Sequence, residues 1–537
     1  MTTDGSFWNG RLKRLVCLTG ASLACGCAAT SAPDAPGERS HGIAAAAAAA
    51  DDPLRAVDPI ALLDRATWGA TGESLMDLHQ QGTHAWLNHQ LHPSADAGLP
   101  AGVQAQIAAL SIQTRDMTES VIELEQARKD FDKVADEVAR KAARQAHQES
   151  MNRIAREACT RMLLRALYSR NQLQEQMTWF WFNHFNIFQG KHDERAMLGD
   201  YEQALRSRAL GRFADLLGTV AHHPAMLVYL DNAQNAAGHI NENYARELME
   251  LHTLGVGAGY TQRDVQELAR VLTGFGVNCN LPDETDQRKQ RGPHGSDYLR
   301  RGLFEFNPNR HDYGDKQLLG TTIRGRGPAE LDQVVELLSR QPATARFVSG
   351  RLAQYFVADT PAPALIDRMA RRFQASDGDI AAVLQTMFES PEFAASLRTR
   401  YKDPLHYVVS AVRLAYDDKP ILNAGPMINW LNRLGEGLYQ RQTPDGYPLL
   451  ESAWTGPGQL TARFEIARAI GSGSAGLFKS DGATPVERPA FPQLANELYY
   501  GYTRQTLATA TRQALDQAVS PQEWNMLLLS SPEFMLR

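Results

Sequence analysis

The most restrictive feature of this sequence is a long stretch that contains neither glycine nor proline. After Gly102 the chain runs through residues 103–189 without either of them, although its 537 residues include 41 glycines and 26 prolines. Loops and β-turns need glycine and proline at frequent intervals, whereas the interiors of α-helices exclude them. The stretch therefore predicts consecutive helices and a mainly α fold class.

Part of this stretch predicts a long charged helical insertion. Apolar side chains recur there at spacings of three or four, with Glu, Lys, Asp and Arg between them; they are Ala127, Phe131, Val134, Val138 and Ala142. Such spacing gives a narrow apolar stripe on an otherwise polar helix, as in a coiled coil. We expect residues 112–170 to form either a protruding helical pair or one long helix that packs through the Phe131 stripe.

Helical periodicity continues through the rest of the chain. It predicts further helices at residues 206–217, 243–254, 262–272, 330–338, 343–357 and 380–388. Short strands are expected only at residues 303–306 and 317–323, beside turns rich in glycine and proline. We therefore expect a multi-helical globular domain with at most a small β-hairpin. Its main helical part is residues 56–400, and a C-terminal helical part is residues 401–537.

The N-terminal segment has the order of an export signal. Arg11, Lys13 and Arg14 precede an apolar run at residues 15–24, and small residues follow it. The run is shorter than the roughly 20 apolar residues that a membrane-spanning helix needs. We predict a signal peptide at residues 1–27 and no transmembrane helix in the mature chain.

Cys27 distinguishes two forms of that signal. Ala24 and Gly26 precede it as small residues do in a bacterial lipobox, so Cys27 is a candidate acylated first residue; the second form is an ordinary cleaved signal. An uncleaved start that stays in the cytoplasm is the remaining alternative to both. Residues 28–55 are rich in alanine and proline and read as a tether. Both forms place the protein in the periplasm or outer cell envelope, and the first adds a lipid anchor to the membrane.

Charge and cysteine content exclude two classes of protein. Lys and Arg total 55 against 61 Asp and Glu, a net charge of -6, so no basic surplus is present to neutralise phosphates and nucleic acid is not an expected partner. Of five cysteines, only Cys159 and Cys279 lie beyond the leader, which excludes a disulfide framework. Two buried thiols are favoured over one bridge between them.

Several segments together carry a family resemblance. They are LLDRATWG at 62–69, NHF at 183–185, PAML at 224–227, LDN at 230–232, NENYARELMELHTLG at 241–255, YT at 260–261, LTG at 272–274, HDYGDK at 311–316 and SPEF at 390–393. In this order they resemble the bacterial family of domain of unknown function 1800 (DUF1800). The resemblance implies an exported protein without an agreed activity, often encoded beside an exported sulfatase- or phosphatase-like protein, which is the expected partner. One position differs from the family: His223 stands before Pro224, where the resemblance leads us to expect an acidic residue.

The loop between two predicted helices at residues 231–242 has some features of a cation site. Asp231, Asn235 and Glu242 stand at the first, fifth and twelfth positions, where a calcium-binding EF-hand loop places oxygen ligands. Ala233 and Ala236 fail the third and sixth positions. Either a divalent cation binds these three side chains, or the loop is a turn-rich connection whose Asn and Asp satisfy local backbone groups.

The next helix carries a polar arc. On a helical wheel Asn243, Arg246, Glu247 and Glu250 share one side, whereas His252 falls among apolar residues and cannot join these carboxylates on one metal. The arc is either a solvated face with an internal Arg246–Glu250 pair or the wall of an active site that includes Glu247.

Two further segments supply imidazole and amine groups. Residues 306–316 are turn-forming and contain His311, Asp312 and Lys316, which makes them a candidate wall for an anionic pocket. His184 lies in a run of six aromatic residues, where a core histidine is the competing interpretation.

These residues define two hypotheses of function. His184, Glu247, His311, Asp312 and Lys316, as catalytic residues, with a divalent cation at Asp231, Asn235 and Glu242, would make a metal-assisted hydrolase. The alternative is a non-catalytic binding or scaffold protein of the envelope, in which the long charged helices dock a second exported partner. Convergence of the candidates in one pocket would favour the enzyme, and their dispersal would favour the binding protein.

Overall fold

The computed structural model describes residues 52–281, 284–417, 419–479 and 491–537. The chain divides into two units, Met1–Asp52 and Pro53–Arg537, and every helix and strand described below lies in the second. The predicted signal peptide, Cys27 and nearly all of the predicted tether lie outside the described residues.

The first helices begin where the sequence supplies caps. Asp58 accepts the backbone N–H of Ala61 and starts α2, and a capping box between Thr71 and Ser74 starts α3. On α2 the fully buried Arg65 donates hydrogen bonds to backbone carbonyls of three later segments. The elements are η1 (Pro53–Ala56), α2 (Pro59–Ala66), α3 (Gly72–Gln81), α4 (Thr83–Leu91), α5 (Ala101–Ala108) and α6 (Ser111–Thr114).

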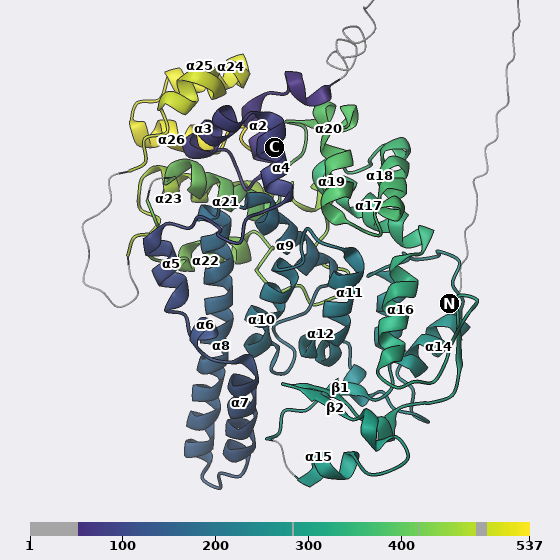
Figure 1. Ribbon diagram of the computed structural model, residues 1–537. Helices are drawn as coiled ribbons and strands as arrows, with labels where there is room; N and C mark the ends of the chain where they lie inside the picture. Colours follow the sequence, from purple (N-terminus) through teal and green to yellow (C-terminus); the bar gives the residue numbers. More distant parts are fainter. Residues whose placement is uncertain (1–51, 282–283, 418, 480–490) are drawn as a thin grey trace, which may run out of the picture. The chain divides into compact units, whose positions relative to one another are not determined.

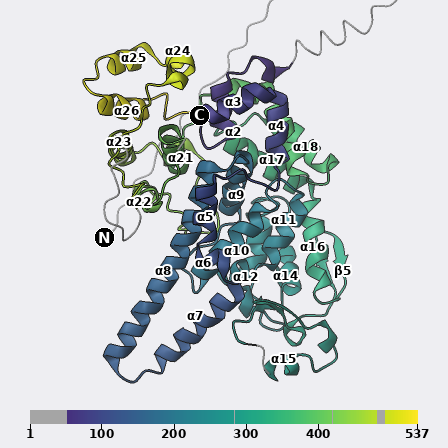
Figure 2. The same ribbon diagram turned by 60° about the vertical axis from the view of Figure 1, so that its left-hand side comes forward.

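The charged insertion is a helical hairpin made of α7 (Met117–Asp132) and α8 (Glu137–Tyr168). In Figures 1 and 2 its far end projects beyond the neighbouring helices, which confirms the helical pair and not the single long helix. The predicted stripe was wrong beyond Phe131, because Val134 lies in the turn and Val138 is 78% exposed. Asp136 starts the new helix by accepting the backbone N–H of Ala139.

The central helices differ from prediction at two ends. Residues 207–212 leave the helical conformation, so the predicted helix at 206–217 was wrong in its first half. α13 ends at Glu250 because the N–H groups of His252 and Leu254 bond to carbonyls five residues earlier. The elements are α9 (Gln172–His184), α10 (Glu194–Arg206), α11 (Phe213–His222), α12 (Pro224–Tyr229), η2 (Asn232–Gln234), α13 (Asn243–Glu250) and α14 (Gln262–Val271).

Two small antiparallel sheets follow α14. Strand β3 pairs on both sides, with Phe306 opposite Phe275 of β1 and opposite Leu299 of β2, while β4 and β5 form a separate hairpin. The predicted strand segments became β3 and the β4–β5 hairpin, whereas β1 and β2 were not predicted. The elements are β1 (Phe275–Val277), α15 (Glu284–Lys289), η3 (Gly295–Asp297), β2 (Leu299–Arg301), β3 (Phe304–Phe306), η4 (Pro308–Arg310), β4 (Lys316–Leu318) and β5 (Thr321–Ile323).

The remainder of the unit is helical, as predicted. Ser390 ends the preceding helix and caps α20, with Pro391 at its first position. The elements are α16 (Ala329–Ser339), α17 (Pro342–Phe356), α18 (Pro363–Ala375), α19 (Ile380–Phe388), α20 (Pro391–Ser396), α21 (Pro404–Ala415), α22 (Gly425–Arg433), η5 (Glu451–Ala453), α23 (Pro457–Gly471), η6 (Tyr499–Thr503), α24 (Arg504–Thr506), α25 (Thr509–Asp516) and α26 (Pro521–Leu529).

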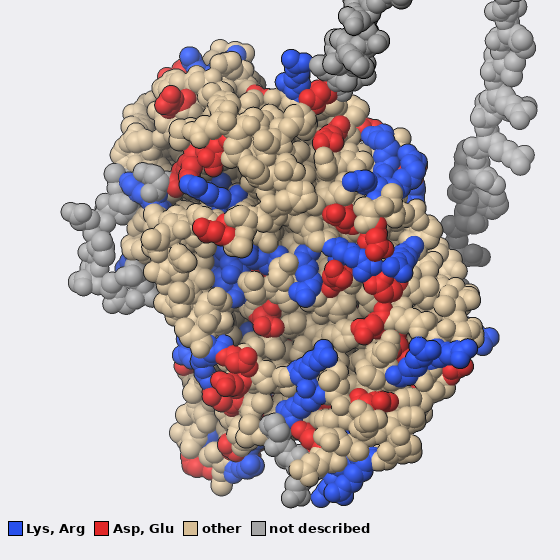
Figure 3. All heavy atoms as spheres, viewed as in Figure 1, with Lys and Arg blue, Asp and Glu red and all other residues tan. Residues whose placement is uncertain are grey.

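The distribution of surface charge and the state of the two cysteines match what the sequence predicts. On the face in Figure 3, acidic and basic side chains are interspersed and form no extended field of one sign. Cys159 and Cys279 are free thiols, the first buried and the second half-buried. Within the described ranges, no helix has both the length and the apolar character needed to cross a membrane.

Candidate functional site

His311 and Lys316 belong to a buried network around Glu330. The Glu330 carboxylate accepts hydrogen bonds from His311 Nε2 (2.9 Å) and Lys316 Nζ (2.5 Å), and from the backbone N–H groups of Arg326 and Gly327. The side chains of His311, Lys316 and Glu330 are fully buried. Lys316 points inward because alternate residues of β4 face the core. The network joins β4 to the first turn of α16.

The Asp312 carbonyl accepts a hydrogen bond from Lys316 of that network, but its carboxylate pairs with another residue. Arg270 of α14 donates to both of its carboxylate oxygens, the shorter distance being 2.7 Å. Although burial pushes its pKa upward, the hydrogen bonds from Arg270 and from the backbone N–H of Gly314 hold the pKa of Asp312 below its usual value. Asp312 is thus a paired carboxylate that fixes the loop to α14.

The three candidate cation ligands are each bonded elsewhere. Asp231 has a left-handed backbone (φ 58°) and pairs with Lys191 at 2.8 Å. The buried Asn235 amide donates to the carbonyl of Ala269, and its oxygen accepts the backbone N–H six residues on. Glu242 accepts hydrogen bonds from Arg246 and a neighbouring glutamine. These bonds match the turn-rich connection. Among the described residues no group of three or more His, Cys, Asp or Glu could hold a metal ion. A cation bound by Asp231, Asn235 and Glu242 remains a prediction, which metal analysis of the purified protein tests.

His184 is a core histidine. Its Nε2 bonds to the carbonyl oxygen of His252 at 3.1 Å, and its ring lies against Phe180 and Phe185. Burial lowers the pKa of His184 to about 3, with smaller contributions from Arg351 and His252.

Two buried side chains, His252 and Glu194, have no hydrogen-bond partner among the described residues. Neither ring nitrogen of His252 is bonded, and burial lowers its pKa to about 3. Neither carboxylate oxygen of Glu194, the first residue of α10, is bonded, and burial raises its pKa well above the ordinary value. Such groups reduce stability unless something else satisfies them.

Glu247 is half-buried on α13. Burial, and after it the charge of Glu250, raises its pKa. The neighbouring Arg246 pairs with Glu250 at 3.3 Å, which confirms the predicted pair on this face.

The candidate residues therefore do not gather around one pocket. The loop at residues 231–242 and the loop at residues 306–316 do touch, since the N–H of Ala237 bonds to the carbonyl of Arg310. However, the bonds and ring contacts of His184 lead to His252 and its aromatic neighbours, and those of His311 lead to Glu330. Within the described residues these contacts favour dispersal of the candidates over their convergence in one pocket.

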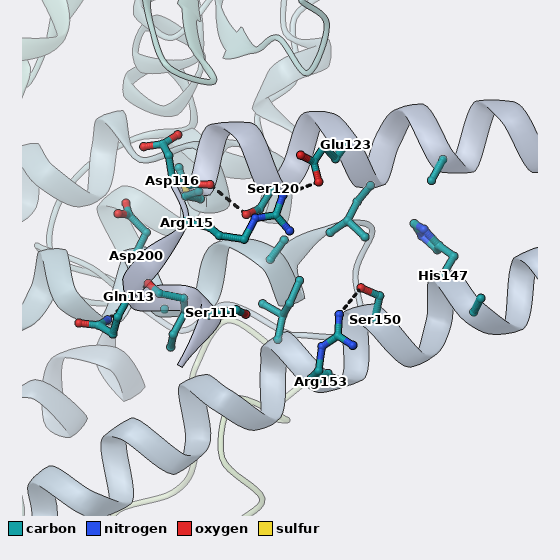
Figure 4. A pocket seen from close by; sticks show the side chains of 18 of the residues that line it. Ser111, Gln113, Arg115, Asp116, Ser120, Glu123, His147, Ser150, Arg153 and Asp200 are labelled. Carbon is teal, nitrogen blue, oxygen red and sulfur yellow. Dashed lines mark hydrogen bonds and ion pairs between the residues drawn. The ribbon is translucent and has the colours of Figure 1, made fainter. Parts of the chain in front are cut away.

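A cavity of about 750 Å³ lies instead between α7, α8 and α10 (Figure 4). We call it the hairpin cavity. Its apolar lining comes mainly from the two arms of the hairpin and the segment before it: Ile112, Met117, Leu124, Ala127, Phe131, Val134, Ala143, Ala146 and Ile154. A volume of this size is typical of small-molecule sites, which are mostly apolar with a few polar groups.

Small side chains account for the hollow. Ala127 on α7 and Ala143 and Ala146 on α8 each offer the cavity only a methyl group. Ala127 and Ala146 are exposed, so the cavity opens to solvent. Packed helices normally fill the space between them with interlocking side chains. Here the facing alanines leave it empty.

Most charged groups of the hairpin cavity are already engaged. Arg115 pairs with Glu123, Asp130 with Lys133, Asp200 with His223 and Arg161 with Glu202. Asp116 accepts two backbone N–H groups at the start of α7. Each carboxylate of the lining therefore has a partner.

Arg153 is the exception among the lining cations. Its side chain is exposed and its guanidinium donates to Ser150 Oγ (3.2 Å), and among the described residues it forms no ion pair. Figure 4 shows Arg153 and Ser150 pointing from α8 toward the space beneath α7. His147 stands farther along the same helix, with its Nδ1 buried and unbonded and its ring 5.5 Å from that of Phe131.

A second cavity, of about 700 Å³, shares Phe131 and His147 with the first. It is lined by His192, Asp193 and Asp231 and by charged residues of α7 and α8. Burial and the charge of Glu125 raise the pKa of Asp193. Its lining also mixes apolar and charged side chains, and the pairs Arg128–Glu125 and Lys191–Asp231 occupy much of its charge.

Sequence reasoning missed Glu330, Arg153 and both cavities. Glu330 stands in an ordinary helical run and gains its role only when the loop of His311 folds against it. The three alanines of the hairpin cavity were the available signal, since small residues along the inner side of a helical pair leave room.

The comparisons with known proteins identify a family and nothing narrower. No curated protein and no solved structure matches the chain. A family model described as a protein of unknown function (DUF1800) matches residues 61–536. That range includes α7, α8 and the Glu330 network. Because the match covers nearly the whole described unit, the chain belongs to the DUF1800 family.

Proposed function

We propose that this chain is an exported envelope protein that binds a small ligand in the hairpin cavity. One observation carries the proposal: the α7–α8 hairpin borders a solvent-accessible space of about 750 Å³, lined by both apolar and polar side chains, that its alanines leave unfilled. Evenly packed helical pairs have no such space, and leaving it costs stability.

The state of three of the five catalytic candidates supports binding over hydrolysis. A general base must come within hydrogen-bond distance of the proton that it removes. The side chains of His311 and Lys316 are fully buried and bonded to Glu330, and His184 is enclosed by aromatic rings. A substrate would have to displace packed core to reach them.

The cavity is tested by filling it. Ala146→Phe places a ring in the hollow and is expected to weaken binding of the neutral apolar dye N-phenyl-1-naphthylamine at least about tenfold, because the dye and the ring compete for one space. Dye fluorescence titrated with protein measures the affinity.

Ala142→Phe is the matched control, since Ala142 is exposed on α8 and does not line the cavity. It should bind the dye as the unsubstituted chain does. Absence of dye binding to the unsubstituted chain, or equal binding by Ala146→Phe, would reject the proposed function.

We also propose cleavage of the leader at Cys27 and residence in the periplasm or outer cell envelope. The basic, apolar and small-residue segments of the leader support it, with Ala24 and Gly26 favouring a lipid anchor. Mass spectrometry of the mature N-terminus, with palmitate labelling, is expected to find an acylated Cys27. An intact Met1 would contradict export, and a cleaved, unlabelled chain would leave an ordinary signal peptide.

An exported sulfatase- or phosphatase-like protein is the partner that the family resemblance suggests. Cross-linking in cells followed by mass spectrometry tests this proposal, and recovery of no protein of that class would count against it.

A further inference from the structure

We infer that the hairpin cavity selects amphipathic organic anions, with an apolar body between α7 and α8 and one carboxylate head on Arg153. This inference rests on the proposed function and narrows the class of ligand. Two observations carry it: among the described residues Arg153 has no carboxylate partner, and apolar side chains line part of the same space.

The charges that remain in the cavity favour an anion. Each lining carboxylate is bonded to a basic side chain or a histidine, or caps a helix, so each already has a partner. Arg153 has only the Ser150 hydroxyl as a partner within the described part of the chain. A guanidinium presents several donors in a planar fork that matches a carboxylate. An incoming carboxylate therefore meets an unpaired cation and displaces no existing ion pair.

The rest of the lining favours an apolar body. Leu124, Phe131 and Ile154 are buried apolar side chains of the cavity lining. They present carbon surface to this part of the space, so an apolar group that covers it is favoured. An acyl chain or an aromatic ring system meets this requirement, whereas a sugar or nucleotide does not.

The order along α8 sets the orientation of the ligand. Arg153 lies six residues beyond His147, so about 9 Å of helix separates them. His147 and Phe131 stand between the two cavities, while Arg153 lines only the first. The head of the ligand thus lies at Arg153, and its body extends along the hairpin toward Phe131.

A pair of probes that differ in charge tests the inference. 11-(Dansylamino)undecanoic acid has an apolar body and a carboxylate, and its methyl ester has the same body without the charge. On the full mature chain, Arg153→Gln is expected to raise the Kd of the acid about tenfold and to leave that of the ester unchanged, since one charge-assisted contact is removed. Higher salt should weaken binding of the acid more than binding of the ester.

Matched variants separate the possible results. Arg156→Gln removes an exposed arginine of the same helix that does not line the cavity and should change neither probe. Ala146→Phe should weaken both probes. Equal Kd values for acid and ester, or no effect of Arg153→Gln on the acid, would overturn the anion preference and leave the proposed function standing. Binding of neither probe, or of both unaffected by Ala146→Phe, would overturn the proposed function itself.

Discussion

Lys316→Met is expected to lower the free energy of unfolding by about 3–5 kcal/mol, the range for a buried ion pair that loses one partner. Lys316 Nζ is the hydrogen-bond donor to Glu330 Oε2, at 2.5 Å, and both side chains are fully buried. Without the ammonium group that oxygen keeps its charge in a space that water does not reach. Chemical denaturation followed by circular dichroism measures the loss.

Two further variants separate a lost charge pair from lost volume. Lys316→Met combined with Glu330→Gln removes both charges and keeps the shape of the acceptor for the backbone N–H groups of Arg326 and Gly327, so it should recover part of the loss. Lys133→Met breaks a pair in which Lys133 is 73% exposed and should change stability by less than about 1 kcal/mol. A loss as small for Lys316→Met as for Lys133→Met would contradict a structural role of the network and return Lys316 to the candidates for chemistry.

Local features of this fold were predictable because they depend on residues close in sequence. The absence of glycine and proline from residues 103–189 predicted the helices that include α7 and α8, and the spacing of Arg246 and Glu250 predicted their ion pair. The end of α7 was predictable in principle. Asp136 is a favoured N-cap residue and is followed by Glu137, which is typical of a helix start. The apolar stripe across this point obscured that signal.

Contacts between distant segments were not predictable in the same way. Glu330 meets His311 and Lys316 only because β4 and α16 pack together, and nothing near Glu330 in sequence distinguishes it from other helical glutamates. The predicted loop ligand Asn235 illustrates the converse. Its sequence position suited a cation, but the fold presents it with the carbonyl of Ala269. Hydrogen-bond partners of a buried amide depend on tertiary packing, which periodicity does not encode.

The hairpin cavity escapes sequence reasoning for a further reason. A hollow is a distance between elements, and the same alanines would pack tightly if α7 and α8 lay closer together. α7 and α8 both pack against α10, and the buried pair of Arg161 and Glu202 joins α8 to that helix. The cavity thus depends on three elements at once.

His252→Leu is expected to raise the free energy of unfolding, by about 1–3 kcal/mol at pH 7.5. Both ring nitrogens of His252 are buried without a partner in the described structure, and leucine has a similar size and no polar atoms. The gain should grow on acidification. Burial lowers the pKa of His252 to about 3 in the folded chain, below the ordinary value of about 6.5, so between these values only the unfolded chain takes up the proton. The unsubstituted chain then loses stability by up to about 1.4 kcal/mol per pH unit, and the variant does not.

Glu194→Met should show the opposite dependence of the free energy of unfolding on pH. Burial raises the pKa of Glu194, so as the pH rises above its ordinary value the carboxyl ionises in the unfolded chain before it ionises in the folded one. That favours unfolding, and the stabilisation gained by Glu194→Met should therefore increase with rising pH.

Urea unfolding of both variants and the unsubstituted chain at pH 5.0, 6.0 and 7.5 measures the two slopes. For His252→Leu the gain at pH 5.0 should exceed that at pH 7.5 by about 2 kcal/mol. A loss of stability in His252→Leu at pH 7.5 would mean that a bound water or ligand satisfies the imidazole, which would make the core beside His184 a site in its own right.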